Sequence, residues 1–142
     1  MSTNALIYIT EANDSIGEPD TVYAVYKHWD GHPQGVQPMI ERALGLAWTL
    51  PRFEADEFAA SFVAANKTSS GDVRLVNPDD ARHTWFDYVY VIRHMDGSTR
   101  KLNVTVGHCT GQDELDRIKF EMHWTGDHTR VAEAYADEED AA

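Results

Sequence analysis

The chain has 142 residues, and its 24 acidic residues against 12 lysines and arginines give a formal net charge of −12 at pH 7. This length suits one domain of ordinary size, and a hydrophobic fraction of 42% is too high for a disordered chain. The acidic excess argues against binding nucleic acid through its phosphates. Apolar runs fall short of the ~20 residues that a membrane span needs, and the single cysteine, Cys109, excludes an internal disulfide and suits the cytoplasm.

Two strands are expected first. Residues 5–10 (ALIYIT) are apolar and rich in β-formers, and residues 21–28 (TVYAVYKH) carry large side chains on both faces. The intervening residues 11–20 contain the Asn, Asp, Ser, Gly and Pro of a long turn. We therefore predict an antiparallel hairpin whose second strand is covered on more than one side.

Two helices are expected next. Apolar residues recur at helical spacing over residues 36–47, with Pro38 in the expected first turn, and Pro51 should stop this helix. A second helix should open near Glu54, because acidic side chains suit the positive N-terminal end of a helix. The sequence TSSGD at residues 68–72 should end it.

The second half of the chain is predicted to be mostly β-structure. A short strand at residues 73–76 precedes the longest one, at residues 84–94 (TWFDYVYVIRH). An Asp-Gly turn at residues 95–98 should return the chain into a strand at residues 99–106. Residues 117–124 (RIKFEMHW) alternate strictly between apolar and polar side chains, which predicts an exposed or edge strand with one wet face.

These elements predict one α+β domain over residues 1–126. We expect a largely antiparallel sheet of five or six strands with two helices packed on one face, in the order β-β-α-α-β-β-β-β. An acidic tail over residues 127–142 follows, beginning with a short helix that Asp127 caps and that frays toward its acidic end.

The strand-to-helix junction at residues 26–35 (YKHWDGHPQG) is the candidate functional segment. Its glycines and proline shape a turn, and the free N–H groups at the start of the following helix can hold an anion. One interpretation is a small ligand-binding pocket; the other is that Trp29 anchors the loop while Asp30 caps backbone N–H groups. The pocket would be lined by Tyr26, His28, Trp29, Asp30, Gly31, His32, Pro33 and Gly35.

The string HWDGHPQGV at residues 28–36, set between a strand and an apolar helix, resembles the YxxWDGYPxG motif of a widespread family of small phage and bacterial proteins. The most specific part of the motif is carried by Trp29, Asp30, Gly31, Pro33 and Gly35. The resemblance covers most of residues 5–106, although His32 replaces the tyrosine of the motif and the extension after Gly107 has no counterpart. The family has no established activity, so the resemblance implies a fold and a phage-like context rather than a reaction.

A metal site is not predicted. His28 and His32 are four residues apart, a spacing that on a helix places two imidazoles on one face, but Gly31 and Pro33 prevent a helix there. A third ligand would have to come from His83, His94, His108 or His123, and nothing in the sequence selects one. We therefore assign no metal ligand and no cofactor.

No catalytic residue is assigned either. Cys109 follows His108, but neighbouring residues on a strand point to opposite faces, and residues 110–112 read as a turn, so Cys109 is expected in a loop. The familiar nucleophile, phosphate-loop and zinc-protease motifs do not occur in the sequence. Enzymatic activity is left open, with a non-catalytic role favoured.

The favoured hypothesis is a non-catalytic phage-type accessory protein that binds a host protein, specifically a counter-defence inhibitor that acts through an acidic surface in the host cytoplasm. Its carboxylates would complement a basic nucleic-acid-binding groove of the partner, with no direct binding of nucleic acid or membrane. The expected contacts are Asp137, Glu138, Glu139 and Asp140. The edge strand at residues 117–124 would also permit a homodimer. The alternative is a small-molecule or nucleotide binder, or a hydrolase, that uses the junction at residues 26–35.

Overall fold

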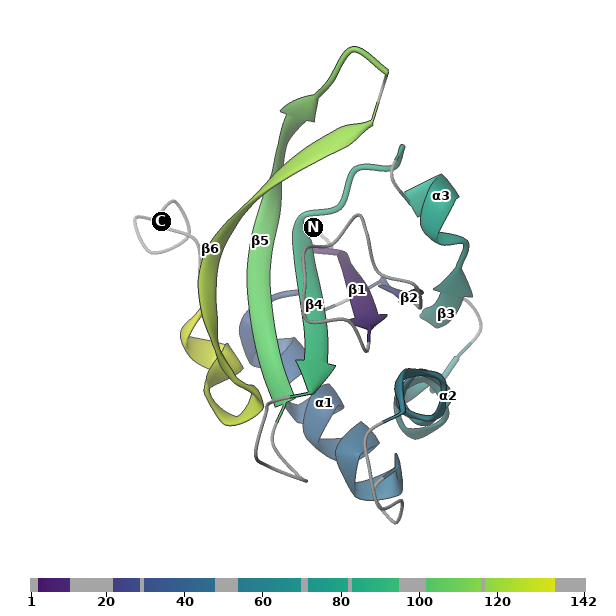
Figure 1. Cartoon of the computed structure of the whole chain (residues 1–142). Helices are drawn as coiled ribbons and strands as arrows, with labels where there is room; N and C mark the ends of the chain where they lie inside the picture. Colours follow the sequence, from purple (N-terminus) through teal and green to yellow (C-terminus); the bar gives the residue numbers. More distant parts are fainter. Residues whose placement is uncertain are drawn as a thin grey trace.

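Six strands form one sheet in the order β3-β2-β1-β4-β5-β6 (Figure 1). The structure is a computed structural model that describes residues 3–10, 22–28, 30–47, 54–69, 72–81, 83–94, 102–115 and 117–134. The strands are β1 (Ala5–Thr10), β2 (Val22–Lys27), β3 (Val73–Val76), β4 (Tyr88–His94), β5 (Leu102–Gln112) and β6 (Ile118–Asp127). β1 and β4 are parallel, and every other neighbouring pair is antiparallel. The predicted α+β class with a largely antiparallel sheet is confirmed.

The two long helices occupy the chain between β2 and β3 and pack against one face of the sheet (Figure 1). The helices of the described residues are α1 (Pro33–Ala47), α2 (Ala55–Asn66), the short α3 (Pro78–Ala81) and the 3-10 helix η1 (His128–Glu133). The buried residues of α1 recur at intervals of three and four, so one stripe of the helix faces the core. Burial of this stripe holds α1 against the sheet, α2 and η1.

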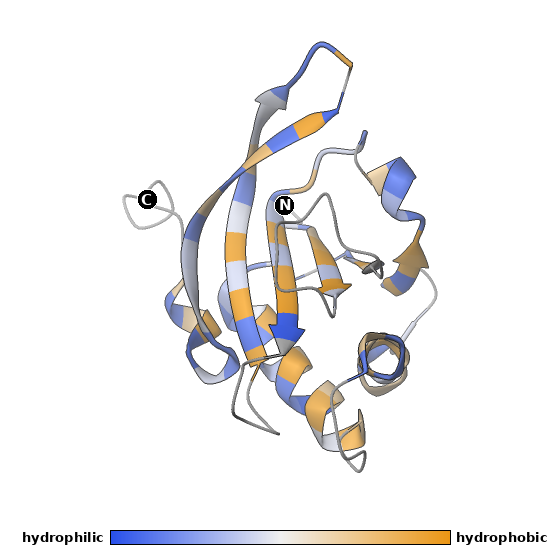
Figure 2. Ribbon diagram, viewed as in Figure 1, coloured by the Kyte–Doolittle hydropathy of each residue, from blue (hydrophilic) through white to orange (hydrophobic). Residues whose placement is uncertain are grey.

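The sheet is apolar on both faces. The helix-side cluster joins the sheet to α1, α2 and η1, and its largest buried members are Tyr90, Phe58, Phe62, Ile7, Ile9, Met39, Ile40 and Ile92. The second-face cluster comprises Leu6, Tyr8, Ala24, Ala81, Phe86, Val89, Val91 and Cys109. The two central strands therefore bury both of their faces, and Figure 2 shows apolar residues along most of β1 and β4.

The strand expected at residues 84–94 begins only at Tyr88, so the first part of that prediction is wrong. The backbone N–H of Phe86 donates to Cys109 Sγ at 3.4 Å, and that of Asp87 donates to the Asn4 side chain at 2.9 Å, so side chains take the place of a strand partner. Phe86 also packs in the second-face cluster, whereas Tyr88 packs in the helix-side cluster. The simple alternation expected through these residues fails at this point.

Helix α3 was not predicted, because no element was expected between the strands at residues 73–76 and 84–94. Pro78 instead occupies the first helical position, where its missing N–H is tolerated. The Asn77 side chain accepts a hydrogen bond from the N–H of Asp79 at 2.8 Å, which is the contact expected of an N-cap. A similar difference occurs in α1, which begins at Pro33, so that Pro38 lies inside the helix and not in its first turn.

Strand β5 is longer than expected and ends at Gln112 instead of residue 106. Cys109 is therefore a buried strand residue, and its expected place in a loop is wrong. Irregularities in the pairing with β6, between Val106 and Gly107 and between Cys109 and Gly111, allow the hairpin to continue. The predicted edge position of the strand at residues 117–124 is confirmed, because β6 lies at the border of the sheet.

The segment after β6 contributes to the core. Asp127 caps η1, as predicted, by accepting a hydrogen bond from the N–H of Thr129 at 2.8 Å. Val131 and Ala134 are buried in the helix-side cluster, and the N–H of Ala132 donates to the Gln37 side chain of α1 at 2.7 Å. Residues up to 134 thus pack on the sheet and α1, while the boundary expected at residue 126 stays a prediction.

Several expected features lie outside the described residues. They are the long turn at residues 11–20, the helix end at Pro51, the Asp-Gly turn at residues 95–98 and the acidic run at residues 137–140. None of the helices in the described ranges is long and apolar enough to cross a membrane.

Candidate functional site

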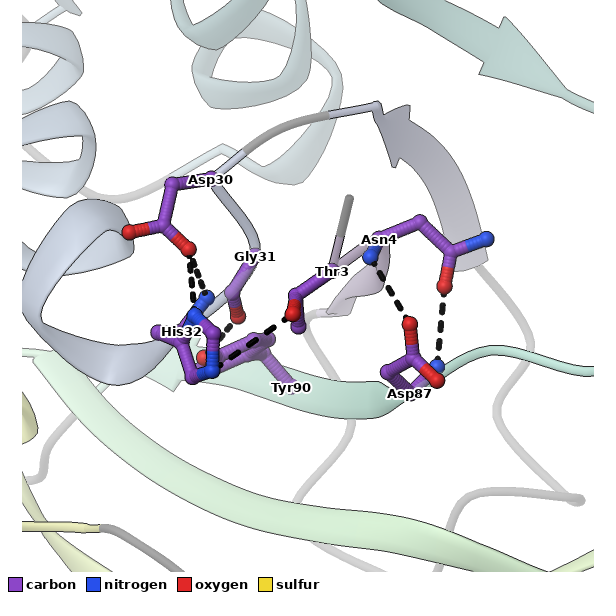
Figure 3. Close-up of polar contacts among 7 residues, drawn as sticks. All are labelled: Thr3, Asn4, Asp30, Gly31, His32, Asp87 and Tyr90. Carbon is purple, nitrogen blue, oxygen red and sulfur yellow. Dashed lines mark hydrogen bonds and ion pairs between the residues drawn. The ribbon is translucent and has the colours of Figure 1, made fainter. Parts of the chain in front are cut away.

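The turn that leads into α1 is organised by the carboxylate of Asp30. Asp30 Oδ1 accepts a hydrogen bond from the backbone N–H of His32 at 2.9 Å and lies 2.6 Å from His32 Nδ1 (Figure 3). Because a carboxylate can only accept, the proton of the neutral imidazole is on Nδ1. His32 Nε2 is then an acceptor, and it faces the hydroxyl of Thr3 at 3.5 Å.

Gly31 is buried between the N-terminal segment and β4. Its N–H donates to the carbonyl of Thr3 at 2.7 Å, and its carbonyl accepts from the hydroxyl of Tyr90 at 2.5 Å (Figure 3). A Cβ at this position would lie 2.6–2.8 Å from backbone atoms of Thr3 and Asn4. Only glycine fits here without moving the backbone, so this residue of the motif has a packing role.

Pro33 and Gly35 complete the same turn. Pro33 is buried and begins α1, and the N–H groups of Gly35 and Val36 donate to the carbonyl of His32 at 2.8 and 3.0 Å. A Cβ on Gly35 would lie 2.7 Å from the carbonyl oxygen of Asp30. Asp30, Gly31, Pro33 and Gly35 therefore build a tight connection between the start of β1 and α1.

The N-terminal segment is fixed on its other side by Asp87. The N–H of Asn4 donates to Asp87 Oδ2 at 3.1 Å, and the N–H of Asp87 donates to Asn4 Oδ1 at 2.9 Å (Figure 3). The N–H of Tyr88 donates to the carbonyl of Asn4 at 3.2 Å. Residues 3 and 4 thus bridge the α1 turn and the residues just before β4.

The expected pocket residues fall into two groups with different neighbours. Asp30 and His32 lie on the helix side, where the His32 ring is 5.7 Å from the ring of Tyr88. Tyr26 packs beside the second-face cluster, 6.1 Å from the ring of Phe86. Tyr26 also makes a hydrogen bond to His28 at 2.8 Å, and the guanidinium of Arg74 lies 4.9 Å over the Tyr26 ring.

The position of Trp29, the indole expected to anchor the loop, lies outside the described residues. Gly31, Pro33 and Gly35 are placed together with Asp30 and His32 in the turn, as given above. The four acidic residues expected to contact a partner, at positions 137–140, also lie outside the described residues.

Cys109 is poorly suited to act as a nucleophile. Burial raises the pKa of its thiol, and a backbone hydrogen bond from Phe86 only partly opposes this effect. The reactive thiolate is thereby disfavoured. Its side chain instead packs in the second-face cluster.

The exposed surface formed by the residues between β3 and β4 was not predicted from the sequence. Trp85 is 50% exposed and follows α3, which carries the exposed Asp79 and Asp80. The segment is held in place from both ends: Thr84 bonds back to α3 through its N–H at 3.2 Å, and Phe86 is buried. Trp85 was interpreted as a core residue of the strand expected at residues 84–94, and its exposure shows that this interpretation was wrong.

Over the described ranges, no three or more histidine, cysteine, aspartate or glutamate side chains gather in a way that could hold a metal ion. Comparison of the chain with protein-family models, with curated proteins and with solved structures found no match.

Proposed function

We propose that this protein is a non-catalytic accessory protein of the phage type that binds a host protein, with Trp85 as the centre of its contact surface. The phage context comes only from the resemblance of residues 28–36 to the family motif. The proposed mode of action is inhibition of a host defence protein by occupation of a basic surface.

The observation that carries the proposal is the half-exposed Trp85 on a restrained segment. Tryptophan is enriched among the residues that contribute most to protein–protein binding. The flanking residues are fixed, because Phe86 is buried and Asp87 is bonded to Asn4. A partner would therefore not have to order this segment on binding, which lowers the entropic cost of association.

Charge supports a basic partner. Residues 78–87 contain Asp79, Asp80 and Asp87, all exposed, against Arg82, which lies outside the described residues. The whole chain carries −12. Such a surface attracts a cationic partner and speeds the encounter, and an exposed indole can also accept a guanidinium over its face. The acidic run at residues 137–140 remains an expected second contact.

The test is affinity capture from a bacterial host lysate with the wild-type chain, Trp85→Ala and Leu46→Ala. Leu46 is the matched control, because it is a large apolar residue of α1 with 55% exposure. We expect a specific protein to be retained by the wild type and by Leu46→Ala, and its purified form to bind Trp85→Ala roughly 30-fold more weakly, which corresponds to about 2 kcal/mol.

Two results would contradict the proposal. One is equal binding of the captured protein to all three chains, and the other is binding that does not weaken between low and moderate salt, since exposed charges are screened by salt. Thermal unfolding of each variant shows whether the substitution has left the fold intact.

A small-molecule site or a hydrolase is the second candidate, favoured by the order Asp30–His32–Thr3. In this order a carboxylate orients an imidazole whose other nitrogen faces a hydroxyl, which is the arrangement that activates nucleophiles in many hydrolases. Thermal-shift screening with nucleotides discriminates the two candidates, because a ligand at 100 times its dissociation constant stabilises by about 2.7 kcal/mol.

A further inference from the structure

Two histidines on the long hairpin face each other across β5 and β6. His108 Nδ1 and His123 Nδ1 are 3.1 Å apart, and the ring centroids are 5.1 Å apart. His123 occupies the bulge of β6, between Met122, which pairs with Gly107, and Trp124, which pairs with Val106. The extra residue of the bulge turns the side chain of His123 toward His108.

The other nitrogen of each ring has an oxygen neighbour that can only accept a proton. His123 Nε2 lies 2.7 Å from the carbonyl of Ala134, so this nitrogen carries the proton of the neutral ring. His108 Nε2 lies 4.0 Å from the exposed Glu121 Oε1, which is beyond hydrogen-bond distance but places a carboxylate beside this ring. In the tautomer that carries a proton on both Nε2 atoms, the two Nδ1 lone pairs converge, and a metal ion can take the place of the proton that otherwise joins the rings.

The geometry points to a divalent transition-metal ion at this place. Two imidazole nitrogens at about 2.0–2.1 Å from a tetrahedral ion are about 3.3 Å apart, close to the 3.1 Å that separates the Nδ1 atoms. A ligating histidine also commonly donates its second N–H to a backbone carbonyl or a carboxylate. The carbonyl of Ala134 is such an acceptor for His123, and the carboxylate of Glu121 lies near His108.

We propose that His108 and His123 form a two-histidine site for a borderline transition-metal ion, with Cu²⁺ bound more tightly than Zn²⁺ and with Mg²⁺ excluded. Imidazole suits copper, nickel and zinc, and the order of affinity peaks at Cu²⁺. Within the described ranges no third side chain completes the site, so water fills the other positions and the affinity is moderate. The proposal is independent of the Trp85 surface.

An ion can reach the site from solvent, and the carboxylate of Glu121 nearby attracts a cation. The His108 side chain is 22% exposed and that of Glu121 is 73% exposed. On the buried side the ring of Tyr88 lies 6.4 Å from the ring of His123. A bound ion would link β5 to β6 and, through His123, to the end of η1.

The experiment uses the full chain without an affinity tag and titrates it with CuCl₂, ZnCl₂ and MgCl₂ by calorimetry. The variants are His108→Ala, His123→Ala and, as a control, His83→Ala, which removes an exposed histidine at the end of α3. We expect one Cu²⁺ per chain, at least tenfold weaker binding of Zn²⁺ and no binding of Mg²⁺. Each site variant should weaken Cu²⁺ binding at least about tenfold, and the control should bind like the wild type.

A second measurement needs no variant. Substoichiometric Cu²⁺ should broaden the imidazole resonances of His108 and His123 in the NMR spectrum of the wild-type chain before those of His28 or His83. Absence of Cu²⁺ binding means that the two rings share only a proton, and it overturns the proposal. The proposal is equally overturned if His83→Ala weakens binding as much as the site variants, or if all histidine resonances broaden together.

Discussion

Gly31 is required by the packing of the turn that leads into α1. Its backbone makes hydrogen bonds to Thr3 and Tyr90, and there is no room for a side chain. We predict that Gly31→Ala destabilises the protein by about 1–3 kcal/mol, the usual cost of overpacking. Chemical denaturation of the two proteins measures the difference.

The matched control is Gly45→Ala. Gly45 is exposed in α1, and a Cβ there would meet nothing within 4 Å. This variant should be more stable than the wild type by roughly 0.5–1 kcal/mol, because alanine is the better helix former. If both variants changed stability equally, close packing at Gly31 would not be the reason for its glycine.

Asp72 gives the protein a dependence on pH. Hydrogen bonds from Thr68 to its carboxylate are the largest cause that lowers the pKa of Asp72, with further bonds from Ser69 and Val73. Since the pKa is lower in the folded state than in the unfolded chain, the stabilisation is present above the unfolded value of about 3.9 and is lost as the pH falls below it.

We therefore predict that Asp72→Asn lowers Tm at pH 7 and that its difference from the wild type shrinks as the pH falls below about 4. Thermal unfolding over this range measures it. Glu41→Gln is the control, because it removes the same charge from an exposed residue of α1. An equal loss of Tm in both variants at pH 7 would attribute the effect to net charge alone.

The two long helices are joined by a buried side chain. Asn66 at the end of α2 donates to the carbonyls of Met39 and Phe62 at 3.0 and 2.9 Å, and its oxygen accepts from Arg42 Nε at 2.9 Å. We predict that Asn66→Ala costs about 1–3 kcal/mol, because the buried hydrogen bonds that this side chain makes between α1 and α2 are lost.

Denaturant unfolding of Asn66→Ala and Asn103→Ala tests this prediction. Asn103 makes only a 3.5 Å contact with Thr125 between two strands near the surface, so its loss should stay within about 0.5 kcal/mol. A larger cost for Asn103→Ala than for Asn66→Ala would show that the contact between α1 and α2 contributes little.

Elements with a clear period were predictable from sequence, and elements set by single contacts were not. The alternation of residues 117–124 identified β6 and its edge position. The start of β4 was missed, because Asp87 and Phe86 fit an alternating pattern but their N–H groups bond to Asn4 and Cys109. A local sequence pattern cannot predict a hydrogen-bond partner that is distant in the chain.

The same limit applies to the candidate sites. The turn at Asp30 and Gly31 was predictable, because Asp and Gly favour turns and Pro33 restricts the backbone at the start of the helix. The pairing of His108 with His123 was not, since it depends on a bulge that shifts the register by one residue. The exposure of Trp85 could not be predicted either, because it depends on which surfaces the rest of the folded chain covers.

At the scale of the whole molecule, both faces of the sheet are apolar, and much of the acidic charge is carried by exposed residues of helices and turns, such as Glu41, Glu57, Asp79 and Glu114. The high net charge is thus compatible with a large core, because charge and core occupy different layers. It also leaves the surface strongly negative. The proposed partner must therefore present a positively charged surface.

The parallel pairing of β1 with β4 has a consequence for the order of assembly. Ala5 lies beside Tyr88, whereas the partners in β4, β5 and β6 are neighbours along the chain. Contacts between distant segments form slowly, because the chain loses the entropy of a long loop before these contacts can stabilise it. The pairing of β1 with β4 should therefore form after the hairpins on either side of it. Until β4 is in place, the carbonyl of Gly31 lacks its hydrogen bond from Tyr90.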